Sequence, residues 1–303
     1  MVTPIRLAAA AGGKGGSWYV LLEGLAQLVH RVHPEIEIQV VEGGGVSNHA
    51  LVGSGQLPMA ILNPPMTAAA LAGTAPFDQP WPELRIGVAN LTVNHLHFVV
   101  AEDVPLTSLA DWFAQNYPLQ IPVDRSSTVD RMVFQIALER YGASEPDLAL
   151  WGGGAIPAMN YHEQLALYQD QKVDALWQFM GIPSPSIQEA HDLRPVKVLP
   201  LPPDLINELV RQGWQPSEIP AGAYGTVEEP IPTVAMSTSL GFHARAPDDV
   251  VFAITEAICQ HYPQVRQIHP AASEFDPAQA HLNPGGQLHA GAEGYFRSKG
   301  LKV

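Results

Sequence analysis

A glycine-rich loop at residues 12–17 offers the chemistry of anion binding. It ends with Gly16 and Ser17, and Trp18 and Tyr19 follow directly. Glycines let the backbone approach a ligand closely, and free N–H groups at a helix start favour an anion. The Lys-Ser/Thr pair of a nucleotide phosphate loop is absent, because Trp18 and Tyr19 stand in its place. We therefore expect an organic anion rather than a nucleotide, with an ordinary strand-to-helix turn as the alternative.

Two further polar segments follow apolar runs in the first part of the chain. Residues 43–48 are a run of three glycines that leads through Val46 to Ser47 and Asn48, and Asn63 precedes two prolines. Ser47 or Asn48 could act simply as a helix cap. If the apolar runs are neighbouring parallel strands, however, all of these residues lie at one edge of the sheet. We expect Ser47, Asn48 and Asn63 to contribute to the same site as the first loop.

A third candidate segment lies in the middle of the chain, where Arg125, Ser126, Ser127 and Thr128 precede an amphipathic run. Hydroxyls and free backbone N–H groups can hold a carboxylate, and each charge-assisted hydrogen bond contributes about 1.5–3 kcal/mol. Arg125 could pair with a carboxylate through two hydrogen bonds. The alternative is a capped helix whose Arg125 points to solvent.

Metal binding and catalysis find little support in the residue patterns. His95 and His97 alternate in a strand-like run, but no histidine or cysteine cluster has the spacing of metal ligands. No Gly-x-Ser-x-Gly turn is present for a serine nucleophile. Asp174 could serve as a general base, although a turn before a buried strand explains it equally well. We expect no metal, no cofactor and no enzyme activity; an enzyme that uses Asp174 or a histidine is the weaker alternative.

The elements that must position these segments alternate between strands and helices. Apolar runs predict strands at residues 5–11, 36–41 and 59–62, with helices at residues 18–30 and 47–53. This order is typical of a parallel sheet, in which ligands gather beyond the carboxyl ends of the strands. A similar α/β pattern restarts with a strand at 119–123 and continues with helices at 129–141 and 161–169 and a strand at 173–179. A helix at 248–261 and a loop followed by a helix at 284–300 end the chain.

A second α/β unit nested between two halves of a first predicts two lobes with a ligand cleft between them. We expect lobe I to comprise residues 1–100 and 230–303, and lobe II residues 101–229. Near these boundaries the sequence has strand-like runs at residues 84–91, 96–101 and 233–242. We expect 96–101 and 233–242 to be the two strands that cross between the lobes. The proline-rich segment 195–232 is predicted to be irregular surface chain.

The charge and composition of the chain indicate which classes of binding partner it can have. The 303 residues carry a formal net charge of −14 at pH 7, with 16 basic and 30 acidic residues. Such a chain is repelled by nucleic acid and by anionic membrane surfaces, so we expect neither as a partner. The single cysteine, Cys259, lies in an apolar helical pattern and is predicted to be buried. No apolar run is long enough to span a membrane, and the N-terminus lacks the pattern of a signal peptide. The chain is then either cytoplasmic or periplasmic with its signal removed.

Taken in order, these segments resemble the TAXI group of TRAP-transporter solute-binding proteins. The similarity covers nearly the whole chain, and it depends on the order and spacing of motifs that are each weak alone. The matching motifs are residues 15–19, 44–48, 96–100, 126–128, 172–175 with 181–183, 223–225, and 288–292 with Tyr295 and Phe296.

The resemblance implies a type II periplasmic-binding-protein fold, in which two α/β lobes are joined by a two-strand hinge. It also implies a periplasmic monomer that delivers a small carboxylate to TRAP membrane permease subunits. By motif matching, the first lobe would contribute Ser17, Tyr19 and Asn48, and the second lobe or the hinge would contribute Ser126, Thr128, Pro183 and Tyr224.

Two departures from the family pattern bear on the ligand. Arg125 and Ser127 replace glycines of the family's second-lobe loop, and Thr92-Val93-Asn94 stands where the family often has Tyr-Pro-Glu. An acidic residue at that point would suit an amino group, so we expect a dicarboxylate or 2-oxo acid rather than a glutamate-like amino acid. A sensor that presents its ligand to a signalling partner is the alternative function.

Overall fold

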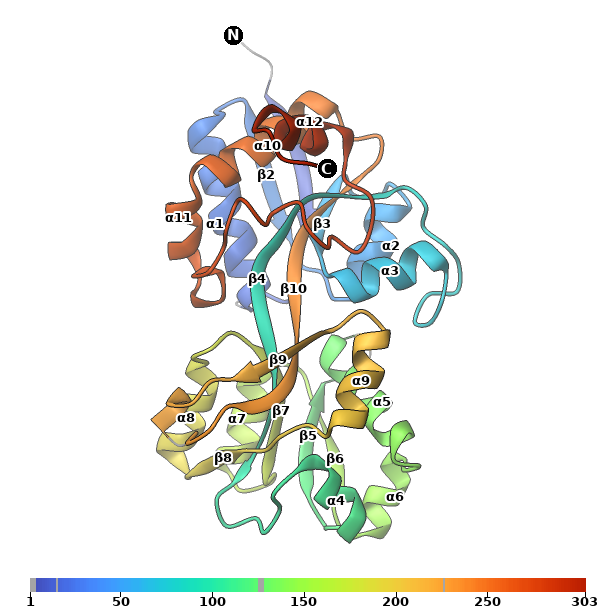
Figure 1. Ribbon diagram of the computed structural model, residues 1–303, viewed down its shortest axis with the longest axis vertical. Helices are drawn as coiled ribbons and strands as arrows, with labels where there is room; N and C mark the ends of the chain where they lie inside the picture. The colour runs from blue at the N-terminus through green and yellow to red at the C-terminus, as the bar shows by residue number, and fades with distance from the viewer. Residues whose placement is uncertain (1–3, 15, 125–127, 226) are drawn as a thin grey trace. The chain divides into compact units, whose positions relative to one another are not determined.

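The computed structural model describes residues 4–14, 16–124, 128–225 and 227–303, which form two compact units (Figure 1). Unit 1 comprises the chain up to Val93 and from Met236 onward, and unit 2 comprises Asn94–Ala235. Two long strands belong to both units, β4 (Leu84–Ala101) and β10 (Ile231–His243). Each unit is an α/β structure, which is the fold class expected from the sequence.

Unit 1 is built around parallel strands. The strand β1 (Ile5–Ala10) pairs in parallel with β2 (Ile36–Val41) on one side and with β3 (Met59–Leu62) on the other. The next strand, β10, is antiparallel to β3, with Leu62 opposite Ser239. The helices α1 (Ser17–Val32), α2 (Ser47–Gly53) and α3 (Pro64–Ala72) each follow one of the parallel strands. The sequence had predicted these strands and the first two helices, but not α3.

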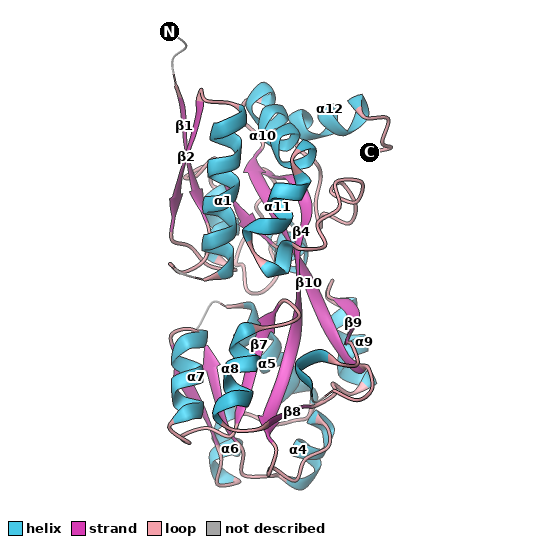
Figure 2. Cartoon of the chain, turned by 90° about the vertical axis from the view of Figure 1, so that its left-hand side faces the viewer, coloured by secondary structure: helices cyan, strands magenta, loops and turns pink. Residues whose placement is uncertain are grey.

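The core of unit 1 joins α1 to helices from the end of the chain. Leu21, Leu22, Leu25, Leu28 and Val29 form the apolar stripe of α1, and all are at most 4% exposed. This stripe shares one buried cluster with residues of α10 (Asp248–Gln260), α11 (Tyr262–Ile268) and α12 (Ala290–Ser298) (Figure 2). Cys259 belongs to the cluster and is 3% exposed, which confirms that it is buried.

Unit 2 repeats the parallel arrangement. The strands β5 (Gln120–Asp124) and β6 (Gly154–Ala158) pair in parallel. The strand β7 (Ala175–Met180) is antiparallel to β4, and its start is joined to the start of β5 by a 2.8 Å bond from Asp174 N to Gln120 O. The helices of the unit are α4 (Leu109–Gln115), α5 (Val129–Arg140), α6 (Glu145–Leu150), α7 (Tyr161–Gln169), α8 (Pro185–Leu193) and α9 (Pro203–Arg211).

Two sequence predictions about secondary structure were wrong. The two strand-like runs between residues 84 and 101 form the single strand β4, because residues 92–95 keep an extended backbone despite their polar side chains. The proline-rich segment 195–232 is not irregular: it contains β8 (Val196–Val198), α9, β9 (Gln215–Ile219) and the short helix η1 (Ala223–Gly225). Three of its prolines stand where they disturb secondary structure little: Pro202 and Pro203 at the start of α9, and Pro216 on the edge strand β9.

Among the described residues, no helix is both long enough and apolar enough to cross a lipid bilayer.

Candidate functional site

The first cluster of predicted site residues lies at one edge of the sheet in unit 1. Because β1, β2 and β3 run parallel, their carboxyl ends meet at the same edge, and α1, α2 and α3 begin there. The N-terminal ends of helices carry unpaired N–H groups and partial positive charge. The structure thus brings Gly16 to Tyr19, Ser47, Asn48 and Asn63 to one sheet edge, as the strand pattern predicted.

Asn48 ties the three strand ends together. Its Nδ2 atom donates to Ala11 O at 2.7 Å and to Ile61 O at 2.8 Å, and its Oδ1 atom accepts the N–H of Gly44 at 2.9 Å. The side chain is fully buried, and both of its amide protons are used by these carbonyls. In this structure Asn48 is therefore a support for the loops, and the amide that the resemblance assigned to a ligand is bonded internally.

The first turn of α1 is open to an anion. Gly16 precedes the helix, with no side chain capping it and no acidic residue in the first turn. Ser17, Trp18 and Tyr19 are half-buried there. A helix of 16 residues with an uncapped N-terminus stabilises a negative charge by roughly 0.3–1 kcal/mol at an exposed position. The acidic side chain of Glu42, on the neighbouring loop, accepts the N–H of Lys14 at 3.0 Å.

The first turn of α2 is also without a side-chain cap. Val46 is the capping residue, and no acidic side chain stands in the first turn. Ser47 is exposed, and its hydroxyl lies 3.5 Å from Gly44 O, at the limit of a hydrogen bond. Neither Ser47 nor Asn48 acts as the simple helix cap that the sequence left open. The Ser47 hydroxyl therefore remains available at this edge.

Asn63 caps α3 and keeps one donor unpaired. Its Oδ1 atom accepts the N–H of Met66 at 3.0 Å, while its buried Nδ2 atom has no hydrogen-bond partner among the described residues. Within the same residues, the buried hydroxyls of Ser237 and Ser239, on the neighbouring strand β10, also lack partners. Leaving a buried polar group unpaired costs about 1–3 kcal/mol, so these three atoms are candidates for a hydrogen bond to a ligand or to water. Sequence reasoning missed both serines, although polar residues 237–239 interrupt an apolar strand.

His49 lies behind this edge and is neutral. Thr67 donates its hydroxyl proton to Asn63 O at 2.8 Å, so the 3.1 Å contact between His49 Nε2 and Thr67 Oγ1 requires the histidine to donate. Burial lowers the pKa of His49 to about 4. The fully buried ring therefore adds no positive charge for an anion at neutral pH.

The second cluster of predicted residues lies in unit 2, where α5 and α8 begin. Thr128 caps α5 by accepting the N–H of Arg131 at 3.2 Å, which agrees with the capping alternative for this residue. Arg125, Ser126 and Ser127, which were predicted to bind a carboxylate, lie outside the described residues. Pro183 is exposed in the segment between β7 and α8.

Tyr224 is joined to this second cluster by its hydroxyl. The phenol oxygen accepts the N–H of Ser184, next to Pro183, at 3.0 Å and lies 2.7 Å from Nε2 of His97. Nδ1 of His97 lies 2.9 Å from the carbonyl oxygen of His95, which can only accept. Nδ1 therefore carries the proton, and Tyr224 donates to Nε2. Pro183 and Tyr224, far apart in the sequence, thus lie in one hydrogen-bonded cluster.

Both ring nitrogens of His97 are engaged in this network, and His95 lies next to it on β4. Burial lowers the pKa of His97 to about 4 and that of His95 to about 4. His95 Nδ1 contacts the hydroxyl of Ser217 at 2.9 Å. Tyr224 itself has a φ of 58°, a left-handed conformation that costs a tyrosine roughly 1 kcal/mol or more. Its two hydrogen bonds offset that strain, so His97 is a supporting residue that sequence reasoning did not assign.

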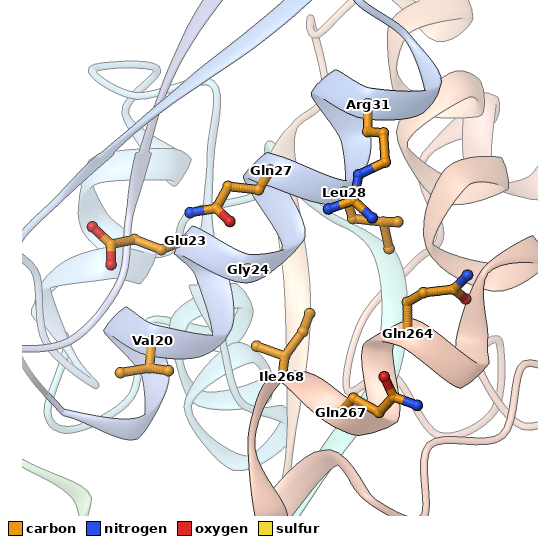
Figure 3. Close-up of a pocket in the computed structure, with 9 residues that line it drawn as sticks. All are labelled: Val20, Glu23, Gly24, Gln27, Leu28, Arg31, Gln264, Gln267 and Ile268. Carbon is orange, nitrogen blue, oxygen red and sulfur yellow. The ribbon is translucent and has the colours of Figure 1, made fainter.

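An open groove of about 410 Å³ lies elsewhere on unit 1, between α1 and α11 (Figure 3). The residues that line it include Glu23, Gln27 and Arg31 of α1 and Gln264 and Gln267 of α11. Ile268 packs against Gly24, where a Cβ atom would lie 2.4 Å from it. The groove runs along the side of α1 and contains none of the predicted site residues. Across the described parts of the chain, no cluster of histidine, cysteine or acidic residues could hold a metal ion.

Comparison with known proteins gives the context for these two clusters. The profile of the NMT1-like family matches residues 9–300. No curated protein sequence matches the chain significantly.

Three solved structures share the fold at low sequence identity. The periplasmic binding protein BugD aligns with a TM-score of 0.56 and 12% identity over 100% of this chain and 99% of its own. MatC from Rhodopseudomonas palustris, solved with bound malate, aligns with a TM-score of 0.54 and 14% identity over 89% of each chain. The effector-binding domain of QuiR in complex with shikimate aligns with a TM-score of 0.51 and 12% identity over 90% of this chain and 100% of its own. The chain has the two-lobed fold of periplasmic binding proteins.

Proposed function

We propose that this chain, which belongs to the NMT1-like family, is a solute-binding protein that holds a small organic anion and delivers it to a membrane permease. The observation that carries the proposal is the carboxyl edge of unit 1. Three helices begin there, and α1 and α2 have neither a side-chain cap nor an acidic residue in the first turn. Such an edge can bind and release an anion without changing it chemically.

The proposed ligand is a carboxylate without an amino group. The proposed donors at the edge of unit 1 are backbone N–H groups, the hydroxyls of Ser17, Tyr19 and Ser47, and Nδ2 of Asn63. None of them would repel a carboxylate. In unit 2, Pro183 and the Tyr224 cluster are proposed as ligand contacts of that unit. The malate held by MatC, a protein of the same fold, supports this ligand class.

The proposed transport system is of the TRAP type, with the chain in the periplasm. The order of the TAXI-like motifs along the chain supports this assignment. It predicts that the chain, loaded with its ligand, stimulates uptake by vesicles that contain TRAP permease subunits. Uptake that stays at the level without the chain would contradict the TRAP assignment and leave the binding function standing.

A ligand sensor is the second candidate function. The effector-binding domain of QuiR has the same fold and was solved with shikimate, which supports this reading. A sensor would bind its ligand equally well but would leave vesicle uptake unchanged. It would instead be recovered in a ligand-dependent complex with a signalling protein.

A thermal-shift screen tests the proposed binding function directly. Malate, adipate, shikimate, 2-oxoglutarate and glutamate would each be added to the purified chain. A ligand at about 100 times its dissociation constant stabilises a protein by roughly 2.7 kcal/mol, which is a shift of several degrees. We expect a diacid or 2-oxo acid to raise the melting temperature and glutamate to leave it unchanged.

Variants connect any hit to the proposed edge. Ser17→Ala and Tyr19→Phe should reduce the shift, whereas Ser273→Ala, at an exposed position outside both clusters, should not. Stabilisation by glutamate alone would overturn the ligand class. Turnover of the bound acid that Asp174→Asn abolishes would overturn the proposal in favour of an enzyme.

A further inference from the structure

Two carboxylic acids are buried together in unit 2, and within the described residues neither forms an ion pair with a cation. Asp124, the last residue of β5, and Asp130, in the first turn of α5, are each 7% exposed. The arginines of this unit that form ion pairs in the described residues pair with other acids: Arg131 with Glu145, Arg140 with Asp204, Arg194 with Asp103 and Asp174, and Arg211 with Glu208. Burying an ionised carboxyl group without a cation costs free energy, and the group avoids this cost by keeping its proton.

Asp130 joins three elements through one carboxyl group. Its Oδ1 atom accepts the hydroxyl of Tyr161, at the start of α7, at 2.6 Å and the N–H of Phe179, in β7, at 2.8 Å. The backbone oxygen of Asp130 accepts the indole N–H of Trp177 at 3.0 Å. Phe179 is the last residue but one of β7, and the segment that carries Pro183 departs from there. The hydrogen bond from Phe179 to Asp130 therefore holds the end of β7, from which this segment departs.

Asp124 supports the same region by a chain of amides. Its Oδ1 atom accepts Nε2 of Gln164 at 2.8 Å, Gln164 Oε1 accepts Nε2 of Gln178 at 3.0 Å, and Gln178 Oε1 accepts the hydroxyl of Ser186 at 3.2 Å. This chain runs from the end of β5 through α7 and β7 to α8. Asp124 is the group of β5 whose charge acts on Asp130.

The surroundings of Asp130 make its protonation sensitive to pH near neutrality. Burial first, and the charge of Asp124 second, raise the pKa of Asp130 to about 7, while the bonds from Tyr161 and Phe179 act in the opposite direction. Of the residues that the structure describes, the titratable groups that act on Asp130 are Asp124 from β5 and Tyr161 from α7. The groups that β7 and α8 contribute to the network, Gln178 and Ser186, are neutral.

We propose that Asp130 is a proton-controlled positioning residue for the unit 2 part of the ligand site. With its proton bound, the carboxyl group accepts the hydrogen bonds of Tyr161 and Phe179 without the desolvation cost of a buried charge. Loss of the proton leaves a buried charge, which destabilises this closed arrangement of α5, α7 and β7 relative to one that opens to water. The consequence for binding rests on the proposed function, since the segment held in this way carries Pro183 and leads to Ser184 and Tyr224.

Thermal unfolding without ligand tests the proton. Wild type and Asp130→Asn would be unfolded at several pH values from 5 to 8, with Asp170→Asn, an exposed acid at the end of α7, as the matched control. The folded protein keeps a proton on Asp130 that the unfolded chain has lost between about pH 4 and 7, so stability from this group falls as pH rises. The melting temperature of Asp130→Asn relative to wild type should therefore rise by about 4 °C or more from pH 5 to pH 8. The Asp170→Asn difference should stay constant.

A second variant and a local measurement keep the test decisive if Asp130→Asn does not fold. Tyr161→Phe removes a donor that favours the ionised form, so it should move the pH dependence to higher pH. Hydrogen exchange of the Phe179–Ser184 peptide, corrected for its intrinsic rate, should be faster at pH 8 than at pH 6 in wild type. Equal loss of stability at every pH in both variants, with exchange independent of pH, would overturn the proposal. These measurements use no ligand, so failure of the organic-acid screen would leave their outcome intact.

Discussion

At the scale of single residues, several side chains that resemble ligand contacts serve the protein's own backbone. The side-chain amide of Asn48 is hydrogen-bonded to Ala11, Ile61 and Gly44, and the Tyr224 hydroxyl is hydrogen-bonded to Ser184 and His97. Asn63, Ser237 and Ser239 instead keep buried atoms unpaired. Supporting residues and residues with unpaired atoms should therefore respond differently to substitution.

Asn48→Ala should destabilise the protein strongly. It leaves two buried carbonyls and one N–H without their partner, and we expect a loss of about 2–4 kcal/mol in the free energy of unfolding. Urea unfolding measures this loss. Ser47→Ala, at the exposed neighbouring position, is the control and should change stability by less than about 0.5 kcal/mol. Equal effects of the two substitutions would show that Asn48 does not tie the strand ends.

Tyr224→Phe should separate the two roles of Tyr224. Without the hydroxyl, the N–H of Ser184 and Nε2 of His97 both lose their partner, at a cost of about 1–3 kcal/mol. If the cluster is part of the site, affinity for the acid found by the thermal-shift screen should fall as well, measured by calorimetry. Tyr262→Phe, on the exposed face of α11, is the control. Unchanged affinity in a less stable Tyr224→Phe protein would assign the residue a structural role alone.

At the scale of elements, the loop between β2 and α2 packs closely against Asn48 and Ala11. A Cβ atom on Gly43 would lie 2.1 Å from Oδ1 of Asn48 and 2.9 Å from Ala11 O, so a side chain there would displace the amide. The neighbouring Gly44 meets only the hydroxyl of Ser47, at 3.2 Å. The glycines of this loop therefore have different functions, although they look alike in the sequence.

Gly43→Ala should consequently disturb the carboxyl edge of unit 1 more than Gly44→Ala. We expect Gly43→Ala to lower stability by about 1–3 kcal/mol, because overpacking forces the loop and Asn48 apart. Gly44→Ala needs only a rotation of the exposed Ser47 side chain. Thermal unfolding of both variants compares them, and a larger loss for Gly44→Ala would contradict the described loop geometry.

At the scale of the whole molecule, buried neutral histidines should make the protein sensitive to acid. Burial lowers the pKa values of His49, His95 and His97 to about 4 each. Because these pKa values lie below those of the unfolded chain, the stability from these groups is present above about pH 6.5 and is lost as pH falls toward 4. Asp130 acts in the opposite direction over much of this range, so comparisons between variants are more informative than the profile of one protein.

His49→Gln should flatten this acid response. Its lowered pKa corresponds to as much as about 3 kcal/mol of differential stability between pH 7 and pH 4. The melting temperature of wild type relative to His49→Gln should therefore fall as pH decreases over that range. His162→Gln, on α7 of the other unit, is the control and should leave the profile of wild type unchanged. Parallel profiles for wild type and His49→Gln would exclude His49 as an acid-sensitive group.

Much of this protein was readable from its sequence, because local patterns specify strands, helices and the residues that follow them. The alternation of apolar runs and glycine-rich turns predicted the parallel strands of unit 1 and the sheet edge that carries residues 16–19, 47, 48 and 63. In unit 2 it predicted β5 but not its parallel partner β6. The resemblance also anticipated the two-lobed fold. The prolines of residues 195–232 misled the prediction, since their effect depends on whether they start a helix or lie on an edge strand.

Only the tertiary structure decided which of these polar residues support the fold and which keep unpaired groups. Asn48 bonds Ala11 and Ile61, 37 and 13 positions away, and Tyr224 bonds His97, 127 positions away. A hydrogen bond between distant residues depends on how strands and loops pack, and no local pattern records it. The same holds for Asp124 and Asp130, whose shared burial becomes visible only when β5, α5, α7 and β7 are assembled.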